Sequence, residues 1–246
     1  MNRNAKEILL GFAAIICCGL VALGGLWCST HSGASPCVNM RVVVQDSTLR
    51  QFVDASEIVN YLDSSGLHPK GKVLATVDCH VLEQKVLQHD RVRTACCYKT
   101  AFDEVCLELT QRVPVLVVVL TDSSSYYVDE DRKVMPYHEK VQVEVPVFRG
   151  LVSEADAKAS YYDFALWLKE NAYWDEKIDE IRVETPNHLV LTQVGDSAFI
   201  ILGGINGYAD KLERLHRFYT KVTEPLALPK YKGYDVRYDG QVVGIK

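Results

Sequence analysis

The sequence lacks a run of basic residues. Its 246 residues include 27 Lys and Arg against 32 Asp and Glu, which gives a formal net charge of −5. Proteins that bind nucleic acid usually concentrate Lys and Arg on one face or along one helix. No such concentration is present, so the sequence argues against a nucleic-acid partner and favours other proteins.

Catalytic signatures are also missing. The chain contains no G-x-S-x-G, S-x-x-K, H-E-x-x-H or P-loop sequence. Its seven histidines are scattered, and Cys79-His80 is adjacent rather than spaced as metal ligands usually are. The glycine-rich residues 203–207 lack the spacing of a dinucleotide loop and are typical of a turn before a helix. We therefore predict a protein that is not an enzyme, with no catalytic residue, metal or cofactor.

Paired cysteines of the C-x-x-C type are absent too, which argues against a thioredoxin-like site or a zinc ribbon. A disulfide between Cys96 or Cys97 and Cys106 is compatible with a hairpin in an oxidising compartment. The alternative is that these cysteines are small buried hydrophobic residues.

One long hydrophobic run is present, at residues 8–28, and it contains no charged side chain. Its length is enough to cross the roughly 30 Å hydrocarbon layer as a helix. Arg3 and Lys6 precede it, and the next basic residue is Arg41. The positive-inside rule then places a cytoplasmic tail at residues 1–7 and the rest of the chain outside the cytoplasm.

A cleaved signal peptide is the alternative, because Ser32-Gly33-Ala34 offers a small-x-small site. The apolar run is longer than a signal peptide normally carries, which favours a retained anchor. Residues 29–37 are small, polar and turn-rich, as expected of a linker that leaves the membrane.

The segment that follows, residues 38–113, shows a β-α-α-β-β pattern. Residues 38–44 are rich in β-branched side chains and predict a strand. Asp54 or Ser56 caps a first predicted helix, and Thr76 or Asp78 caps a second. In that second helix the apolar side chains are those of Val81, Leu82, Val86 and Leu87. Residues 92–99 and 105–111 predict two further strands.

Residues 114–246 predict a strand-dominated second domain. The expected strands include a hairpin around residues 130–132, an extended stretch at 145–150, and strands at 179–184, 188–194 and 198–202. Ser153 is expected to open one helix, and residues 207–222 predict another amphipathic helix. The fold class is thus α+β: a single transmembrane helix, a small β-α-α-β-β domain and a larger strand-rich domain.

Several segments resemble the FtsQ/DivIB family of cell-division proteins, and the β-α-α-β-β unit resembles a POTRA domain. The segments that carry the resemblance are Phe52-Val53-Asp54 with Glu57-Ile58, Cys97-Tyr98-Lys99-Thr100, residues 105–114, residues 126–129 with 134–136, and the tail from Asp235 to Gly244. The tail is the strongest part, since the family pattern there is hydrophobic-Asp-hydrophobic-Arg-Tyr.

The resemblance implies a division-site scaffold in the bacterial cytoplasmic (inner) membrane, with its bulk in the periplasm. It implies partners of the FtsB/FtsL type, which are small single-span coiled-coil division proteins, and contact by strand addition at a late strand. Carried over to this sequence, the expected partner-binding residues are Tyr234, Asp235, Val236, Arg237, Tyr238, Val242, Val243 and Gly244. For single apolar members such as Val236 or Tyr238, packing in the core is an equally good interpretation.

Two other functions compete with this one. Another POTRA-bearing envelope assembly or transport component would carry an outer-membrane barrel or tandem POTRA units, and the sequence shows neither. A membrane-tethered hydrolase with an unrecognised site would lose its function when a single Asp, Glu, His or Ser is replaced, without losing its partners.

Overall fold

The computed structural model describes residues 35–46, 52–138, 143–223 and 231–246. They form two compact units, divided between Gln111 and Arg112, which we call the N-terminal and the C-terminal unit. None of the helices in these described ranges is long and apolar enough to cross a membrane. The span expected at residues 8–28 lies outside the described residues.

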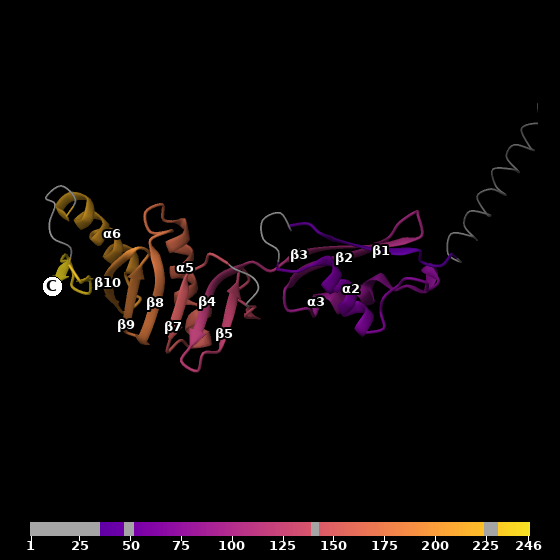
Figure 1. Cartoon of the computed structure of the whole chain (residues 1–246), viewed down its shortest axis with the longest axis horizontal. Coiled ribbons are helices and arrows are strands. Elements are labelled where there is room, and N and C mark those ends of the chain that lie inside the picture. The colour runs from indigo at the N-terminus through magenta and orange to yellow at the C-terminus, as the bar shows by residue number, and fades with distance from the viewer. Residues whose placement is uncertain (1–34, 47–51, 139–142, 224–230) are drawn as a thin grey trace, which may run out of the picture. The chain divides into compact units, whose positions relative to one another are not determined.

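The N-terminal unit packs two helices on one face of a three-stranded sheet, as Figure 1 shows. Its elements in chain order are β1 (Asn39–Val44), α2 (Ala55–Ser64), a 3₁₀ turn (Leu74–Thr76), α3 (Cys79–Leu87), β2 (Val92–Lys99) and β3 (Glu104–Gln111). The central strand β3 pairs in parallel with β1 and antiparallel with β2.

Both helices begin where the sequence predicts. The Asp54 side chain accepts a hydrogen bond from the Ser56 N–H, and the Asp78 side chain accepts from the amides of the next turn. The predicted apolar face of α3 is only half right, because Leu82 and Val86 are buried while Val81 and Leu87 are exposed. A helix that covers a narrow sheet buries a stripe thinner than its apolar pattern.

The hairpin disulfide that the sequence allows does not fit the strand register. Cys97 lies opposite Leu107, whereas Cys106 lies opposite Tyr98. Successive residues of a strand point to opposite faces, so Cys97 and Cys106 face away from each other. Cys96 shares the face of Cys106 but is offset by two positions, which exceeds the usual Cα separation of a disulfide.

The C-terminal unit is built on one nine-stranded sheet, in the order β12-β11-β10-β9-β8-β7-β4-β5-β6. Its strands are β4 (Pro114–Leu120), β5 (Ser125–Asp129), β6 (Val134–Pro136), β7 (Val147–Gly150), β8 (Ile178–Thr185), β9 (His188–Gln193), β10 (Asp196–Gly203), β11 (Gly233–Asp235) and β12 (Val243–Ile245). The pairs β4–β7, β7–β8 and β10–β11 are parallel.

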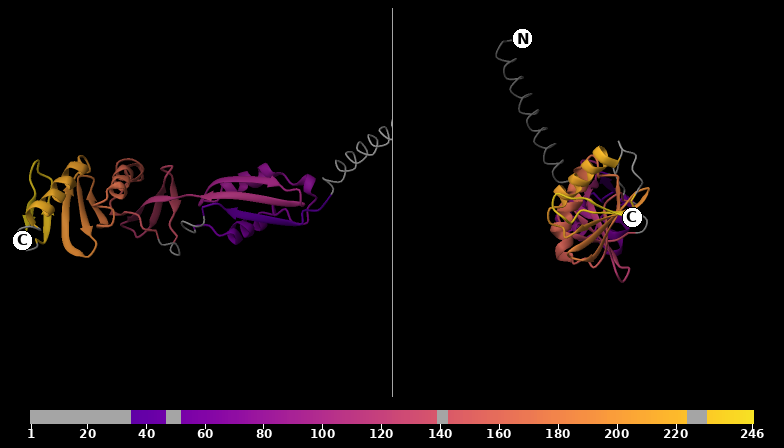
Figure 2. Two further views of the ribbon diagram at one scale, coloured as in Figure 1. Left: turned by 90° about the horizontal axis from the view of Figure 1, so that it is seen from above. Right: turned by 90° about the vertical axis from the view of Figure 1, so that its left-hand side faces the viewer.

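Two main helices, α5 (Ser160–Glu170) and α6 (Tyr208–Phe218), bury their apolar sides against this sheet in one core. The ring centroids of Phe164 on α5 and Tyr208 on α6 are 4.8 Å apart, so the helices also touch each other. Figure 2 shows α6 close to the C-terminal strands in a second view. The β-α-α-β-β unit and the strand-rich α+β unit of the predicted fold class are therefore confirmed.

The helix predicted to open at Ser153 is divided in two. Ser153 caps a short helix, α4 (Glu154–Lys158), and the backbone breaks at Ala159 before α5 begins. The break frees the carbonyl of Lys158 from helical bonding, and Arg132 donates a hydrogen bond to it at 2.8 Å. The helix predicted over residues 207–222 is also modified, since α6 ends at Phe218 and continues as a π-helical turn, Tyr219–Thr223.

Candidate protein-binding site

The C-terminal tail joins the sheet through a crossover that α6 provides. The chain leaves β10, runs through α6, and returns as β11 parallel to β10. Lys211 on α6 donates to the carbonyls of Leu202 and Gly204 at 3.1 and 2.8 Å, which fixes the start of the helix against the end of β10. The buried Leu212 and Leu215 hold α6 on the sheet.

The strand at the edge of the sheet is β12 and not β11. β11 is paired on both sides, with β10 and with β12. β12 pairs antiparallel with β11 in the register Tyr234↔Gly244 and has a sheet neighbour on that side only, within the described residues. The Lys232 N–H donates to the Ile245 carbonyl. Because a strand's backbone groups alternate in direction, those of Gly244 point to the outer edge.

Three of the eight residues predicted to bind a partner lie inside the protein. Tyr234, Asp235 and Val236 are 4, 6 and 0% exposed. The Tyr234 ring makes edge contacts with Tyr219, whose centroid is 5.0 Å away, and with Tyr231, at 5.8 Å. These residues build the platform on which β12 lies.

Asp235 and Arg237 form the polar link between this platform and the surface. The Arg237 guanidinium donates to both Asp235 carboxylate oxygens, with Nη2 at 2.7 Å from Oδ2 and Nε at 3.0 Å from Oδ1. These hydrogen bonds hold the pKa of the Asp235 carboxyl below its ordinary value. The Arg237 stem lies over Gly203, which has φ +74° and no room for a Cβ. Arg237 is thus fixed in place although much of its side chain is exposed.

The other predicted residues lie at the surface around β12. Tyr238 and Val243 are 53% and 42% exposed, and Val242 and Gly244 are half-buried. The Tyr231 ring lies against Gly244, where a Cβ would approach it to 2.6 Å. The structure therefore gathers Arg237, Tyr238 and Val243 near one sheet edge.

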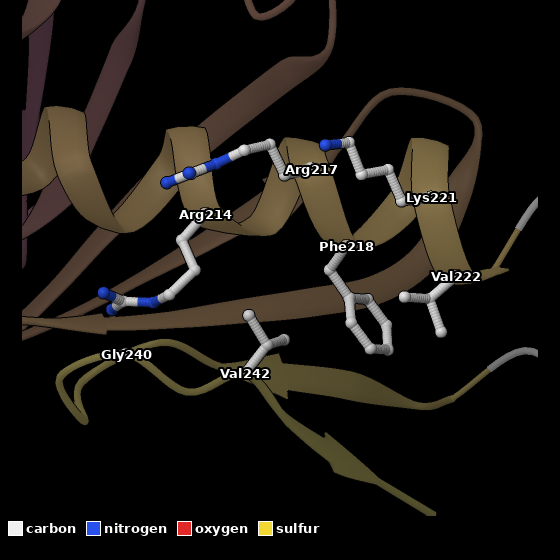
Figure 3. Close-up of a pocket in the computed structure, with 7 residues that line it drawn as sticks. All are labelled: Arg214, Arg217, Phe218, Lys221, Val222, Gly240 and Val242. Atoms are coloured by element: carbon white, nitrogen blue, oxygen red, sulfur yellow. The ribbon is translucent and has the colours of Figure 1, made fainter.

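A pocket of about 470 Å³ lies between α6 and the tail next to this edge. Figure 3 shows Phe218 and Val222 reaching from the α6 segment toward Val242 of the tail, so the inner wall is apolar. Three cations complete the lining together with Gly240, namely Arg214, Arg217 and Lys221. The combination suits an apolar side chain that is flanked by carboxylates.

Arg214 connects the pocket to the platform. Its Nη2 donates to the Val236 carbonyl at 2.8 Å, and its Nε is buried without a hydrogen-bond partner. Arg217 and Lys221 are exposed, and they line the pocket from the helical segment that also carries Phe218 and Val222 (Figure 3). Sequence reasoning missed these cations. Their spacing of three and four residues, beside Phe218 and Val222, was the signal for a basic helix face.

Within the described residues, no group of His, Cys, Asp and Glu side chains is arranged to hold a metal ion. At the tail the structure presents backbone groups on a strand edge, an exposed tyrosine, a fixed arginine, and a pocket with a cationic rim. Tyrosine and arginine are enriched at the centres of protein interfaces.

Comparison with known protein families covers both units. A model described as "POTRA-like domain" matches residues 35–110, and one described as "FtsQ/DivIB, C-terminal related" matches residues 113–245. No curated protein matches the chain. The second model alone spans more than half of the 246 residues, and the chain therefore belongs to the FtsQ/DivIB family of cell-division proteins.

Proposed function

We propose that this protein is a non-catalytic scaffold that recruits and links small single-span coiled-coil division proteins of the FtsB/FtsL type. Its family gives it a role in cell division, at the division site, through protein–protein contacts. The proposal adds the class of partner and the place of contact.

The observation that carries this proposal is the edge position of β12. An edge strand offers unpaired N–H and C=O groups to which a partner strand adds, and neighbouring side chains select the sequence. Tyr238 and Val243 are exposed here, and Arg237 is fixed by Asp235. We propose Arg237, Tyr238, Val242, Val243 and Gly244 as the contact residues, with Tyr234, Asp235 and Val236 as their support.

We further propose that the adjacent pocket takes an apolar side chain of the same partner, with acidic residues beside it. Phe218, Val222 and Val242 supply apolar surface, and the Arg217 and Lys221 side chains supply positive charge at the rim. A partner segment with alternating apolar and acidic residues would satisfy the strand edge and the pocket together.

The test is co-purification of the full chain with its coiled-coil division partners from detergent-solubilised membranes. The double variant Tyr238→Ala/Val243→Asp should reduce the recovered partner at least about tenfold, because it removes an exposed aromatic contact and places a charge at the edge. The matched control is Val194→Asp, since Val194 is 60% exposed in the turn between β9 and β10. Thermal unfolding should be unchanged in both.

Normal recovery of the partners with the folded double variant would exclude β12 as the docking edge. Loss of the partner with Val194→Asp as well would mean that the effect of the double variant is not specific to the β12 edge.

We also propose that residues 8–28 anchor the protein in the cytoplasmic membrane, with residues 1–7 inside and the two units outside. Carbonate extraction of membranes should leave the chain in the pellet, and protease added to intact spheroplasts should digest both units. Release by carbonate would contradict the anchor.

A further inference from the structure

The N-terminal unit places two cysteines together that are far apart in the sequence. Cys97 on β2 is buried, and it faces α3 because Leu107, opposite it in the register, belongs to the core. The Cys97 N–H donates to the Glu83 carboxylate of α3 at 2.7 Å. Glu83 lies one helical turn after Cys79, the first residue of α3, so Cys79 and Glu83 share the helix face toward β2.

Through this arrangement the Cys79 and Cys97 side chains face each other across the packing of α3 on β2. The interaction with Cys79 is also one of the causes that raise the pKa of the Cys97 thiol. The other described cysteines are placed elsewhere: the Cys37 thiol donates to the Asn39 carbonyl, Cys96 is exposed, and Cys106 is on the opposite face of the sheet from Cys97. Cys79 and Cys97 are thus a specific pair.

We propose that Cys79 and Cys97 form a disulfide bond that joins the first turn of α3 to the middle of β2. Both residues are free thiols here, so the bond requires an oxidant, which is a disulfide of a small molecule or of an oxidase protein. Oxidising compartments outside the cytoplasm supply such disulfides. This site is independent of the partner-binding edge, which belongs to the other unit.

The chemistry proceeds by two exchanges. The Cys79 thiolate attacks the donor disulfide, so that a mixed disulfide forms and one donor thiolate leaves. The Cys97 thiolate then attacks the Cys79 sulfur and displaces the second donor thiolate. Two protons and two electrons leave the cysteines, and the electrons reduce the donor.

The order of attack follows from burial. Cys79 is half-buried and accessible to a donor, whereas Cys97 is inside the core. Burial raises the pKa of the Cys97 thiol well above its ordinary value, so Cys97 is a poor first nucleophile. Once Cys79 carries the donor, the position of Cys97 on the facing strand makes the second exchange intramolecular.

The bond should be detected by mass spectrometry of the full chain after incubation with oxidised glutathione. Trypsin cleaves after Lys72, Lys85, Arg93 and Lys99, which puts Cys79 in residues 73–85 and both Cys96 and Cys97 in residues 94–99. In the Cys96→Ser variant Cys97 is the one cysteine of the second peptide, so a link to that peptide must involve Cys97. We expect the two peptides to be joined in this variant and separated after reduction.

The matched variant is Cys97→Ser, in which the exposed Cys96 remains. The linked peptide should be lost, because Cys96 points to the other face of the sheet. Oxidation of the Cys96→Ser protein should also raise the unfolding temperature of the N-terminal unit by roughly 10 °C. The disulfide closes a loop in the chain and so reduces the conformational entropy of the unfolded state. The proposal would be overturned if Cys79 and Cys97 both still react with an alkylating reagent after prolonged oxidation of the folded protein. A disulfide from Cys79 to Cys96 instead of Cys97 would also overturn it.

Discussion

Single residues determine how the segment before α2 is held. Phe52 and Val53 are buried, and both of their N–H groups donate to the Gln111 side-chain oxygen at 2.6 and 2.7 Å. Gln111→Leu would leave two buried donors without their acceptor, which should cost about 3 kcal/mol of unfolding free energy. Urea unfolding measures this difference. Gln45→Leu is the control, since it removes an exposed side-chain hydrogen bond to Glu108 and should cost much less; an equal cost for both would contradict the explanation.

At the tail, the Asp235 carboxyl should make the stability of the fold depend on pH. Its pKa is lowered in the folded protein by hydrogen bonds from Arg237. A carboxyl of this kind stabilises the fold above its unfolded pKa of about 4, and the stabilisation is lost as the pH falls through the folded pKa. Unfolding of the full chain followed from pH 7 to pH 2 should therefore show a steeper loss of stability below pH 4 than in Asp235→Asn.

The control for that experiment is Asp239→Asn, which changes an exposed carboxyl in the neighbouring turn. It should retain the steep loss. Identical acid profiles for the wild type and Asp235→Asn would show that the Arg237 pair contributes nothing to stability.

At the scale of elements, the junction between β7 and β8 depends on the absence of a side chain. Gly150 ends β7 with φ +117°, and a Cβ there would lie 2.4 Å from the Val183 carbonyl oxygen. Gly150→Ala should destabilise the C-terminal unit by about 3 kcal/mol, because both the backbone and the contact are strained. Gly195→Ala is the control, since Gly195 also has positive φ but open space; it should cost about 1 kcal/mol. Equal losses in thermal unfolding would argue against the steric contact.

Local signals explain which elements the sequence predicts well. Helix caps such as Asp54 and Asp78 act within one turn, and both are confirmed. The tail is different, because its burial depends on pairing with distant strands. Alternation along residues 234–238 cannot reveal that β11 is an interior strand, so the sequence does not distinguish the buried Val236 from the exposed Tyr238. The pocket escapes prediction for the same reason, since α6 and Val242 meet only through the fold.

At the scale of the whole molecule, the two compact units divide at Gln111 and Arg112. We expect residues 35–111 and 112–246 to fold as separate fragments, each with a single cooperative transition in calorimetry. A division after Leu120 should yield no folded C-terminal fragment, because it removes β4 from between β7 and β5. An unfolded 112–246 fragment would show that this unit needs the other to fold.

We expect the cations of α6 to affect the association rate of the proposed partner more than its dissociation rate. Arg217 and Lys221 are exposed at the rim, where charges mainly accelerate encounter with an acidic segment and are screened by salt. Arg237 is already neutralised by Asp235, so contacts at the strand edge depend little on ionic strength. Added salt should therefore slow the association of the partner while its dissociation rate stays nearly constant. Stopped-flow measurements of the association and dissociation rates, on the wild type and on Arg217→Gln/Lys221→Gln, would test this expectation.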